Sequence, residues 1–232
     1  MDRPRTAVLR PLAEFDGSLA QRAYLSLKGA ILELGLRPGK MLRKPEICEA
    51  LGVSRSPVSE AVARLAAEAL VEVVPQAGTF VARLSMAEVR EGAFLREALE
   101  VAAVEAVAAV ADADALASLR ANLSAQEEAV GEGDRAGFYA LDERFHEAIL
   151  GMTGHRRLPG FSRTAWVHVD RARRLLLPEP GRMAATVEEH RAVLAALEAR
   201  DGDRARAAMR AHLRQLVERL ERLAGERGEL FS

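Results

Sequence analysis

The chain has 232 residues, of which 49% are apolar and 29% charged, a composition typical of globular proteins that excludes a disordered chain. Its 33 basic and 34 acidic residues nearly cancel, which excludes a polycation that coats nucleic acid or anionic lipid along its whole length. The single cysteine, Cys48, cannot form an internal disulfide, and residues 1–19 lack the apolar core of a signal peptide. The longest strongly apolar stretch, 101–110, is interrupted by Glu105 and is too short to span a membrane. We therefore expect a cytoplasmic protein.

Charge and secondary-structure signals both change near residue 84. Residues 1–84 contain 12 basic and 9 acidic residues, a net charge of +3, whereas the remaining residues contain 21 and 25, a net charge of -4. The first part holds nearly all of the strand-like sequence, and the second part has the composition of long helices rich in Ala, Leu, Glu and Arg. The pattern predicts two domains that follow an N-terminal tail of residues 1–18.

Three helices and a hairpin are predicted in the first domain. Apolar residues recur at helical spacing within 19–34, and a shorter helix is expected over 45–52. A third helix is expected to begin at a Ser54 or Ser56 cap, and its inward apolar face comprises Val58, Val62, Leu65 and Ala69. The β-branched runs 71–74 and 79–81 flank a turn at 75–78. Residues 19–84 therefore form a predicted winged helix-turn-helix domain.

Helix-breaking residues divide the second domain into about six segments. The breakers lie at 112, 131–133, 151–154, 178–181 and 202. We expect an all-helical bundle over residues 85–226, followed by a C-terminal tail of residues 227–232, so the fold class is mainly α.

The third helix is predicted to read DNA, because the second helix of a helix-turn-helix motif enters the major groove with its N-terminal side chains facing the bases. Arg55 is the first candidate for base contact, and Ser56 and Ser59 lie on the same leading side. The remaining DNA-binding candidates are Arg43, Lys44 and Arg64 on phosphates and Gln76, Gly78 and Thr79 at the wing. The same fold also serves protein contacts, so the residues alone leave that alternative open.

The run from Leu51 to Val62, Leu-Gly-Val-Ser-Arg-Ser-Pro-Val-Ser-Glu-Ala-Val, followed by Pro-Gln-Ala-Gly-Thr-Phe-Val at 75–81, resembles the GntR family of bacterial transcriptional regulators. The resemblance implies that this domain binds operator DNA. Three positions depart from the family pattern, which usually has a second Arg at Ser59, a polar pair at 44–45 and a polar residue at Ala77. Loss of a bidentate Arg weakens discrimination at its base pair by about 1 to 3 kcal/mol, so we expect an altered operator preference.

Four residues of the second domain have the types and spacing of metal ligands. Asp142 and His146 are four residues apart on one helical face, and His190 and His212 lie on two other predicted helices. Three imidazoles and a carboxylate suit a divalent ion, with Zn expected first and Ni or Mn as alternatives. Spacing alone favours histidines that lie on the surface or are satisfied in the core over a metal site.

The motifs Asp-Glu-Arg-Phe-His at 142–146, Glu-His at 189–190 and Ala-Ala-Met-x-x-His ending at His212 are similar to the FCD ligand-binding domain of the FadR branch. The resemblance implies that Asp142 and the three His residues bind a divalent metal. Arg-Glu-Ala-Leu-Glu at 96–100 matches a family motif whose Arg often holds an effector carboxylate. The effector-binding candidates are Arg96, Glu100, Tyr139 and Arg173. An inter-helix salt bridge is the alternative role for Arg96.

These observations predict a ligand-responsive transcriptional regulator, expected to be a repressor, that binds a palindromic operator as a homodimer and responds to a small carboxylate beside a metal. Two alternatives remain. A metal-dependent hydrolase would need a general base beside the ligands, and the sequence identifies none, so we expect no enzymatic activity. A metal could also hold three helices together without any effector.

Overall fold

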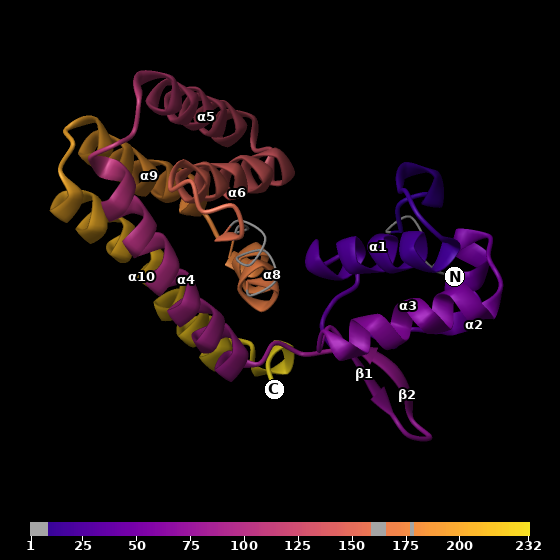
Figure 1. The fold of residues 1–232 in the computed structure, drawn as a ribbon. Helices are drawn as coiled ribbons and strands as arrows, with labels where there is room; N and C mark the ends of the chain where they lie inside the picture. The colour runs from indigo at the N-terminus through magenta and orange to yellow at the C-terminus, as the bar shows by residue number, and fades with distance from the viewer. Residues whose placement is uncertain (1–8, 159–165, 177–178) are drawn as a thin grey trace. The chain divides into compact units, whose positions relative to one another are not determined.

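The computed structural model describes residues 9–158, 166–176 and 179–232, which divide into two compact units (Figure 1). One unit comprises Met1–Ser85 together with Arg227–Ser232, and the other comprises Met86–Glu226. Residues 1–8 of the predicted tail and residue 178 of the predicted breaker at 178–181 lie outside the described residues.

The first unit contains the predicted three helices and hairpin. Its helices are α1 (Leu19–Leu32), α2 (Lys44–Leu51) and α3 (Arg55–Ala67), and its strands are β1 (Val71–Val74) and β2 (Gly78–Val81). The strands pair antiparallel with Val71 opposite Val81, which forms the wing. Ser54 occupies the N-cap position of α3, but its side chain makes no capping hydrogen bond. The structure confirms the winged helix-turn-helix.

Apolar side chains of α1 and α3 form the core of this unit. Leu27 and Ile31 of α1 and Val58 and Leu65 of α3 are buried, because their helical spacing brings them to facing sides of the two helices. The expectation that Ala69 extends this face is wrong. Ala69 follows the end of α3 in a left-handed backbone conformation and is exposed.

The predicted C-terminal tail folds with the winged unit. Residues 228–230 form a short 3-10 helix, η2 (Gly228–Leu230), and the following residues bond to the chain just before the second unit begins. The Leu84 amide donates to the Leu230 carbonyl, and the Ser232 amide donates to the Leu84 carbonyl, both at 2.9 Å. Leu84 and Leu230 are both buried, so residues 228–232 become an added edge of this unit.

Six helices lie in the described part of the second unit. They are α4 (Met86–Ala108), α5 (Ala113–Glu132), α6 (Arg135–Met152), α8 (Val167–Leu176), α9 (Arg182–Glu198) and α10 (Gly202–Glu226). Asp112 caps α5 through a bond from the Ala115 amide, and Gly133 ends it in a left-handed conformation. The predicted breakers at 112 and 131–133 therefore act as expected.

The long helices α4 and α10 pack against each other along their lengths, and α5, α6 and α9 complete the bundle (Figure 1). Its apolar core includes Val104, Phe145, Ile149 and Leu197, which are fully buried. None of the helices in the described ranges has the length and apolar content needed to span a lipid bilayer. The described residues thus form a mostly helical protein with one small sheet.

Candidate functional site

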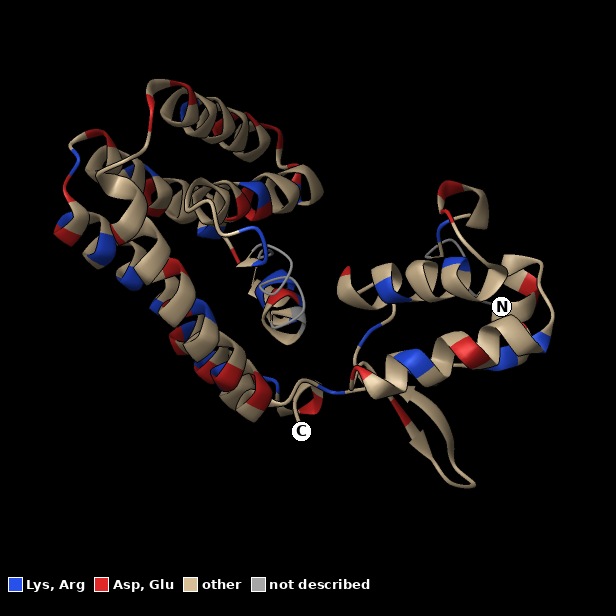
Figure 2. Ribbon diagram, in the orientation of Figure 1, with Lys and Arg blue, Asp and Glu red and all other residues tan. Residues whose placement is uncertain are grey.

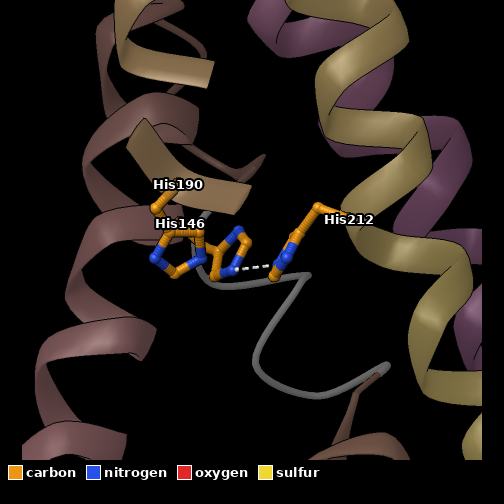
Figure 3. A group of neighbouring side chains, drawn as sticks. All are labelled: His146, His190 and His212. Carbon is orange, nitrogen blue, oxygen red and sulfur yellow. Dashed lines mark hydrogen bonds between the residues drawn. The ribbon is translucent and has the colours of Figure 1, made fainter. Parts of the chain in front are cut away.

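Three histidines from three helices meet inside the helical unit (Figure 3). His146 lies on α6, His190 on α9 and His212 on α10, and all three side chains are buried. One ring nitrogen from each lies within 4.8 Å of those of the other two. The predicted ligands His146, His190 and His212 therefore form one cluster, even though 66 residues separate the first from the last in the sequence.

Each imidazole is held at its Nδ1 atom by a different side chain. His146 Nδ1 lies 2.5 Å from Glu100 Oε2, and His212 Nδ1 lies 2.6 Å from Glu189 Oε2. His190 Nδ1 lies 2.9 Å from Gln126 Oε1. An acceptor at Nδ1 keeps the proton there and leaves the lone pair on Nε2, which is the arrangement found behind metal-bound histidines. Neither Gln126 nor the role of Glu189 is predicted from sequence.

The orientation of the Gln126 amide follows from a chain of hydrogen bonds. The Asn122 amide nitrogen donates to the Leu141 carbonyl at 3.0 Å, and that carbonyl can only accept. The Asn122 oxygen must then face Gln126, whose amide nitrogen donates to it at 2.7 Å. The Gln126 oxygen is left facing His190, which fixes the His190 proton on Nδ1.

The electrostatics of the cluster favour neutral imidazoles. Burial lowers the pKa of His146 and of His190, and it lowers the pKa of His212 to about 3 despite the neighbouring Glu189. Burial alone would raise the pKa of Glu189, but hydrogen bonds from His212 and Arg182 lower it to about 2. A neutral imidazole is the protonation state that binds a metal ion.

The residues present fit a divalent cation. Nε2 of His146 lies 3.3 Å from Nε2 of His212, and both atoms carry lone pairs once the Nδ1 protons are committed. Two nitrogens that each lie 2.0 to 2.1 Å from a tetrahedral zinc ion are about 3.3 Å apart. Nε2 of His190 is buried and has no hydrogen-bond partner among the described residues. A cation would satisfy all three atoms.

The fourth predicted ligand, Asp142, lies beside the three histidines. Its Oδ1 atom is 3.7 Å from Nε2 of His190, and its Oδ2 atom forms an ion pair with Arg173 of α8. Burial, followed by the charge of Arg96, lowers the pKa of Arg173 to about 9, so the guanidinium is still charged at neutral pH. Asp142 is therefore shared between the histidine cluster and an arginine.

A small cavity of about 40 Å³ adjoins the cluster. Three of the predicted effector residues line it, Arg96, Tyr139 and Arg173, together with Asp142 and His212. At about 10 to 15 Å³ per water, it has room for about three water molecules. Two polar residues that the sequence did not single out also line it, Arg182 and Thr186. Arg182 forms a bidentate pair with Glu189 seven residues later, a spacing that places both on one face of α9.

The prediction that Glu100 contacts an effector does not fit its position. One carboxylate oxygen accepts from Arg96 Nε at 2.5 Å and the other bonds His146, and Glu100 does not line the cavity. Burial alone would raise the pKa of Glu100, but the charge of Arg96 and the contact with His146 hold it well below its usual value. Glu100 therefore links Arg96 to the histidine cluster. The Arg96 Nη2 atom is buried and has no hydrogen-bond partner among the described residues.

Some DNA-binding candidates have exposed side chains, whereas others contact neighbouring side chains of the fold. Arg55 and Ser56 are exposed at the start of α3. Lys44 Nζ lies 3.5 Å from Ser59 Oγ, so these two candidates meet where α2 approaches α3. Arg43 is exposed and pairs with Glu46 at 3.1 Å. Arg55 and Ser56 therefore stay exposed on the first turn of the helix predicted to read DNA.

Arg64 and Thr79 contribute to the packing of the winged unit. Arg64 donates to Gln21 at 2.5 Å, and its guanidinium lies 3.8 Å from the Tyr24 ring centroid on α1. Thr79 is buried, and its carbonyl accepts from the Leu42 amide. Gln76 is exposed in the hairpin turn with a left-handed backbone, and Gly78 begins β2. The wing tip is thus presented by Gln76 and not by Thr79.

Two protein families match the two units. Residues 19–81 match the family of bacterial regulatory proteins called the gntR family, and residues 91–215 match the FCD domain. The first match covers the winged helix-turn-helix, and the second contains the three histidines, Asp142 and Arg96. These families are transcriptional regulators and not enzymes.

Relatives and solved structures agree with this assignment. An uncharacterized HTH-type transcriptional regulator of Streptomyces ambofaciens, in an unstable DNA locus, is 38% identical over 95% of this chain and 93% of its own length. The HTH-type transcriptional repressor RspR of Escherichia coli is 30% identical over 91% of this chain and 93% of its own length.

The solved structure of E. coli McbR/YncC superposes with a TM-score of 0.73 at 25% identity, covering 90% of this chain and 99% of that one. A GntR regulator of Rhodococcus sp. RHA1 has a similar fold, with a TM-score of 0.75 at 24% identity. The match covers 88% of this chain and 98% of that one. The chain therefore belongs to the GntR family of bacterial transcriptional regulators and carries an FCD domain behind its DNA-binding domain.

Proposed function

We propose that this regulator is a repressor of the FadR branch that binds a palindromic operator as a homodimer and is controlled by a small carboxylate bound beside a divalent metal. The convergence of three neutral imidazoles beside an arginine-lined cavity carries the proposal. Operator binding implies a cytoplasmic location in a bacterial cell. Relief of repression by the effector is the expected polarity, in line with the role of the E. coli relative RspR as a repressor.

In this proposal Arg55 reads a base and Arg43 and Lys44 contact phosphates. Arg55 is exposed on the first turn of α3, where a helix-turn-helix presents side chains to the major groove. Alanine at Arg55 should cost about 1 to 3 kcal/mol on the specific operator and much less on unrelated DNA. Equal losses on both DNAs would contradict a base-reading role.

His146, His190 and His212 would hold the metal, with Asp142 as the neighbouring carboxylate. The nitrogen ligands suit zinc and also admit nickel or manganese. When bound, the ion supplies a Lewis-acidic anchor for an anionic ligand. Glu100, Gln126 and Glu189 keep the three rings in the required tautomer and orientation.

The cavity chemistry favours a small organic acid. Arg96, Arg173 and Arg182 bring three guanidinium groups to its wall, and a guanidinium binds a carboxylate with two parallel hydrogen bonds. Asp142 occupies Arg173, so an anionic ligand and Asp142 compete for the same guanidinium. The effector changes DNA binding only if it binds the two functional states unequally.

Fluorescence anisotropy on DNA from the upstream region of the coding sequence tests the proposal. The protein is titrated against that fragment and a scrambled one, with zinc or chelator, and with a panel of small carboxylates. We expect a preference of about 10³ or more for the upstream fragment and its loss on adding one carboxylate in the presence of zinc.

The matched variants are His146→Ala in the cluster and His155→Ala, an exposed histidine outside it. The first should abolish the carboxylate response and the second should retain it. A zinc-dependent gain in stability with no response to any carboxylate would favour a structural metal, and equal binding to both fragments would refute sequence-specific regulation.

A further inference from the structure

Asp142 presents its two carboxylate oxygens to two different groups. The side chain is buried on α6, one helical turn before His146. Its Oδ2 atom pairs with the Arg173 guanidinium of α8, and its Oδ1 atom lies 3.7 Å from His190 Nε2. No proton stands between the last two atoms, because Gln126 holds the His190 proton on Nδ1. Two acceptors therefore lie side by side, an arrangement that a nearby cation would stabilise.

Arg173 relies on Asp142 for its strongest ion pair. Its side chain is only 13% exposed, so water replaces little of that interaction. A second carboxylate, Asp170, lies one turn earlier on α8 at 3.4 Å, which is long for a charge-assisted bond of about 2.7 to 2.9 Å. Figure 2 shows basic and acidic residues together on this short helix. If Asp142 turned away, the guanidinium would lack a close anionic partner, and another anion would be favoured in its place.

The other two arginines on the cavity wall have partners of a different kind. Arg96 donates to Glu100 at 2.5 Å, and Arg182 forms its bidentate pair with Glu189. Both glutamates also bond the Nδ1 atom of a clustered histidine, so a cation at the Nε2 atoms leaves these pairs in place. Of the three arginines, only Arg173 has a partner that is itself a candidate metal ligand. A single ion pair therefore links the metal site to the cavity.

We propose that Asp142 exchanges between Arg173 and the bound cation, so that metal binding frees Arg173 to hold the effector carboxylate. The freed guanidinium lines the cavity, as does Arg96, whose Nη2 atom is buried without a hydrogen-bond partner among the described residues. These two groups offer N–H donors to one carboxylate. In the metal-free protein Asp142 occupies Arg173, and an effector has to displace it.

The exchange makes the two ligands cooperative. Each of them favours the state in which Asp142 has left Arg173. Such coupling is reciprocal, so a carboxylate raises the affinity for metal by the same factor as the metal raises the affinity for the carboxylate. A regulator built in this way responds to its effector only when metal is loaded. The inference rests on the proposed metal and carboxylate binding and adds how one controls the other.

Isothermal titration calorimetry of the metal-free full chain with zinc tests the exchange. Acetate is the carboxylate probe, because its small size suits a cavity with room for about three water molecules, and sodium chloride at equal ionic strength is the reference. The zinc affinity of the wild type should be at least about 5-fold higher in acetate. Arg173→Met should reduce this ratio to less than about 2. The same variant should bind zinc more tightly in chloride, because Asp142 no longer has a competing partner.

Arg174→Met is the matched control. Arg174 is the next residue on α8, so its replacement removes the same charge from the same helix. Its guanidinium lies 3.4 Å from the Tyr139 ring centroid, and it does not line the cavity. The effect of acetate should stay at least about 5-fold in this variant. Equal losses in both arginine variants would indicate a general effect of charge and would overturn the exchange.

Asp142→Asn tests the same exchange without removing a buried cation. The uncharged amide pairs more weakly with Arg173. The metal-free variant should therefore bind acetate at least about 5-fold more tightly than the metal-free wild type in an NMR titration. An unchanged acetate affinity would overturn the proposal.

The wild type separates failure of the exchange from failure of the proposed function. Zinc and acetate that both bind without affecting each other would overturn the exchange and leave the proposed metal and effector sites intact. A wild type that binds no zinc would refute the proposed function and the exchange with it.

Discussion

The two units differ in what they bury. Among the described residues of the winged unit, the buried polar side chains are Ser26 and Thr79, both uncharged. The helical unit buries Arg96, Glu100, Asp142 and the three clustered histidines. Because buried charges contribute little net stability, such a network indicates a function in the interior. The winged unit instead exposes the DNA-binding candidates Arg55 and Ser56 over an apolar core.

Acidification should produce the largest difference in stability between the two units. All five histidines lie between residues 146 and 212, so the winged unit contains none. The pKa of each clustered histidine is lower in the fold than its usual 6.5, so below that pH the unfolded chain binds more protons and stability falls. Each imidazole lowers the free energy of unfolding by up to about 1.4 kcal/mol per pH unit. The three together therefore lower it by up to about 4 kcal/mol per pH unit.

Hydrogen exchange of the chelated protein at pH 7 and pH 5 measures this difference. Protection should drop in peptides of α6 and α9 and stay constant in those of α3. Equal losses in α3 would contradict the contrast between the two interiors.

Removal of the Glu100 carboxylate should be the most damaging single change of charge. Glu100→Leu leaves Arg96 buried without its partner, which costs about 3 to 5 kcal/mol. Denaturant unfolding followed by Trp166, the single tryptophan, reports on the helical unit. Glu198→Leu is the control, because it breaks the exposed pair with Arg120 and should cost less than about 1 kcal/mol. Similar losses in both variants would argue against a buried network.

Gln126 should influence the proposed metal site without contacting the ion. Gln126→Leu removes the acceptor at His190 Nδ1 and should weaken zinc binding about 10- to 100-fold in competition with a chelating dye. Gln126→Glu keeps an acceptor at His190 Nδ1 but places a second acceptor against the Asn122 oxygen, so its affinity should lie between those of the wild type and the leucine variant. A wild-type affinity in the leucine variant would show that the Nδ1 partner of His190 does not matter.

The smallest expected effect distinguishes two arginines of the winged unit. Arg64→Met should lower the stability of that unit by about 1 kcal/mol, because it removes the contact with the Tyr24 ring. It should leave the salt dependence of DNA binding unchanged, whereas Arg43→Met should reduce the slope of log K against log salt by about one. A reduced slope for Arg64→Met would indicate that Arg64 contacts a phosphate.

Local signals in the sequence were sufficient for most of the fold. Caps and breakers such as Asp112 and Gly52 act within one turn, and apolar spacing places Val58 and Leu65 inward, so these features could be predicted. Residue types and spacing allowed the three histidines to meet, but only the family resemblance favoured that grouping. Their outer partners depend on the register between helices, which no local pattern encodes; Gln126 and Arg182 were therefore missed.

For Arg64 and Glu100, residue type alone suggested roles that their contacts in the fold do not support. Their residue types fit a phosphate contact and an effector contact, respectively. In the fold, however, Arg64 packs on Tyr24 of α1, and Glu100 pairs with Arg96 on its own helix and bonds His146 of α6. Tertiary contacts decide between such roles. The pairing of residues 228–232 with Leu84 belongs to the same class, because it joins segments about 145 residues apart in the sequence.

That pairing has a consequence for synthesis. A chain growing from the ribosome can form the three helices and the hairpin once residue 84 has emerged, but Leu84 meets Leu230 only after the whole helical unit has been made. The hydrogen bonds and buried surface of this edge are therefore the last that the winged unit acquires. A nascent regulator should complete its DNA-binding unit only when the helical unit has been translated.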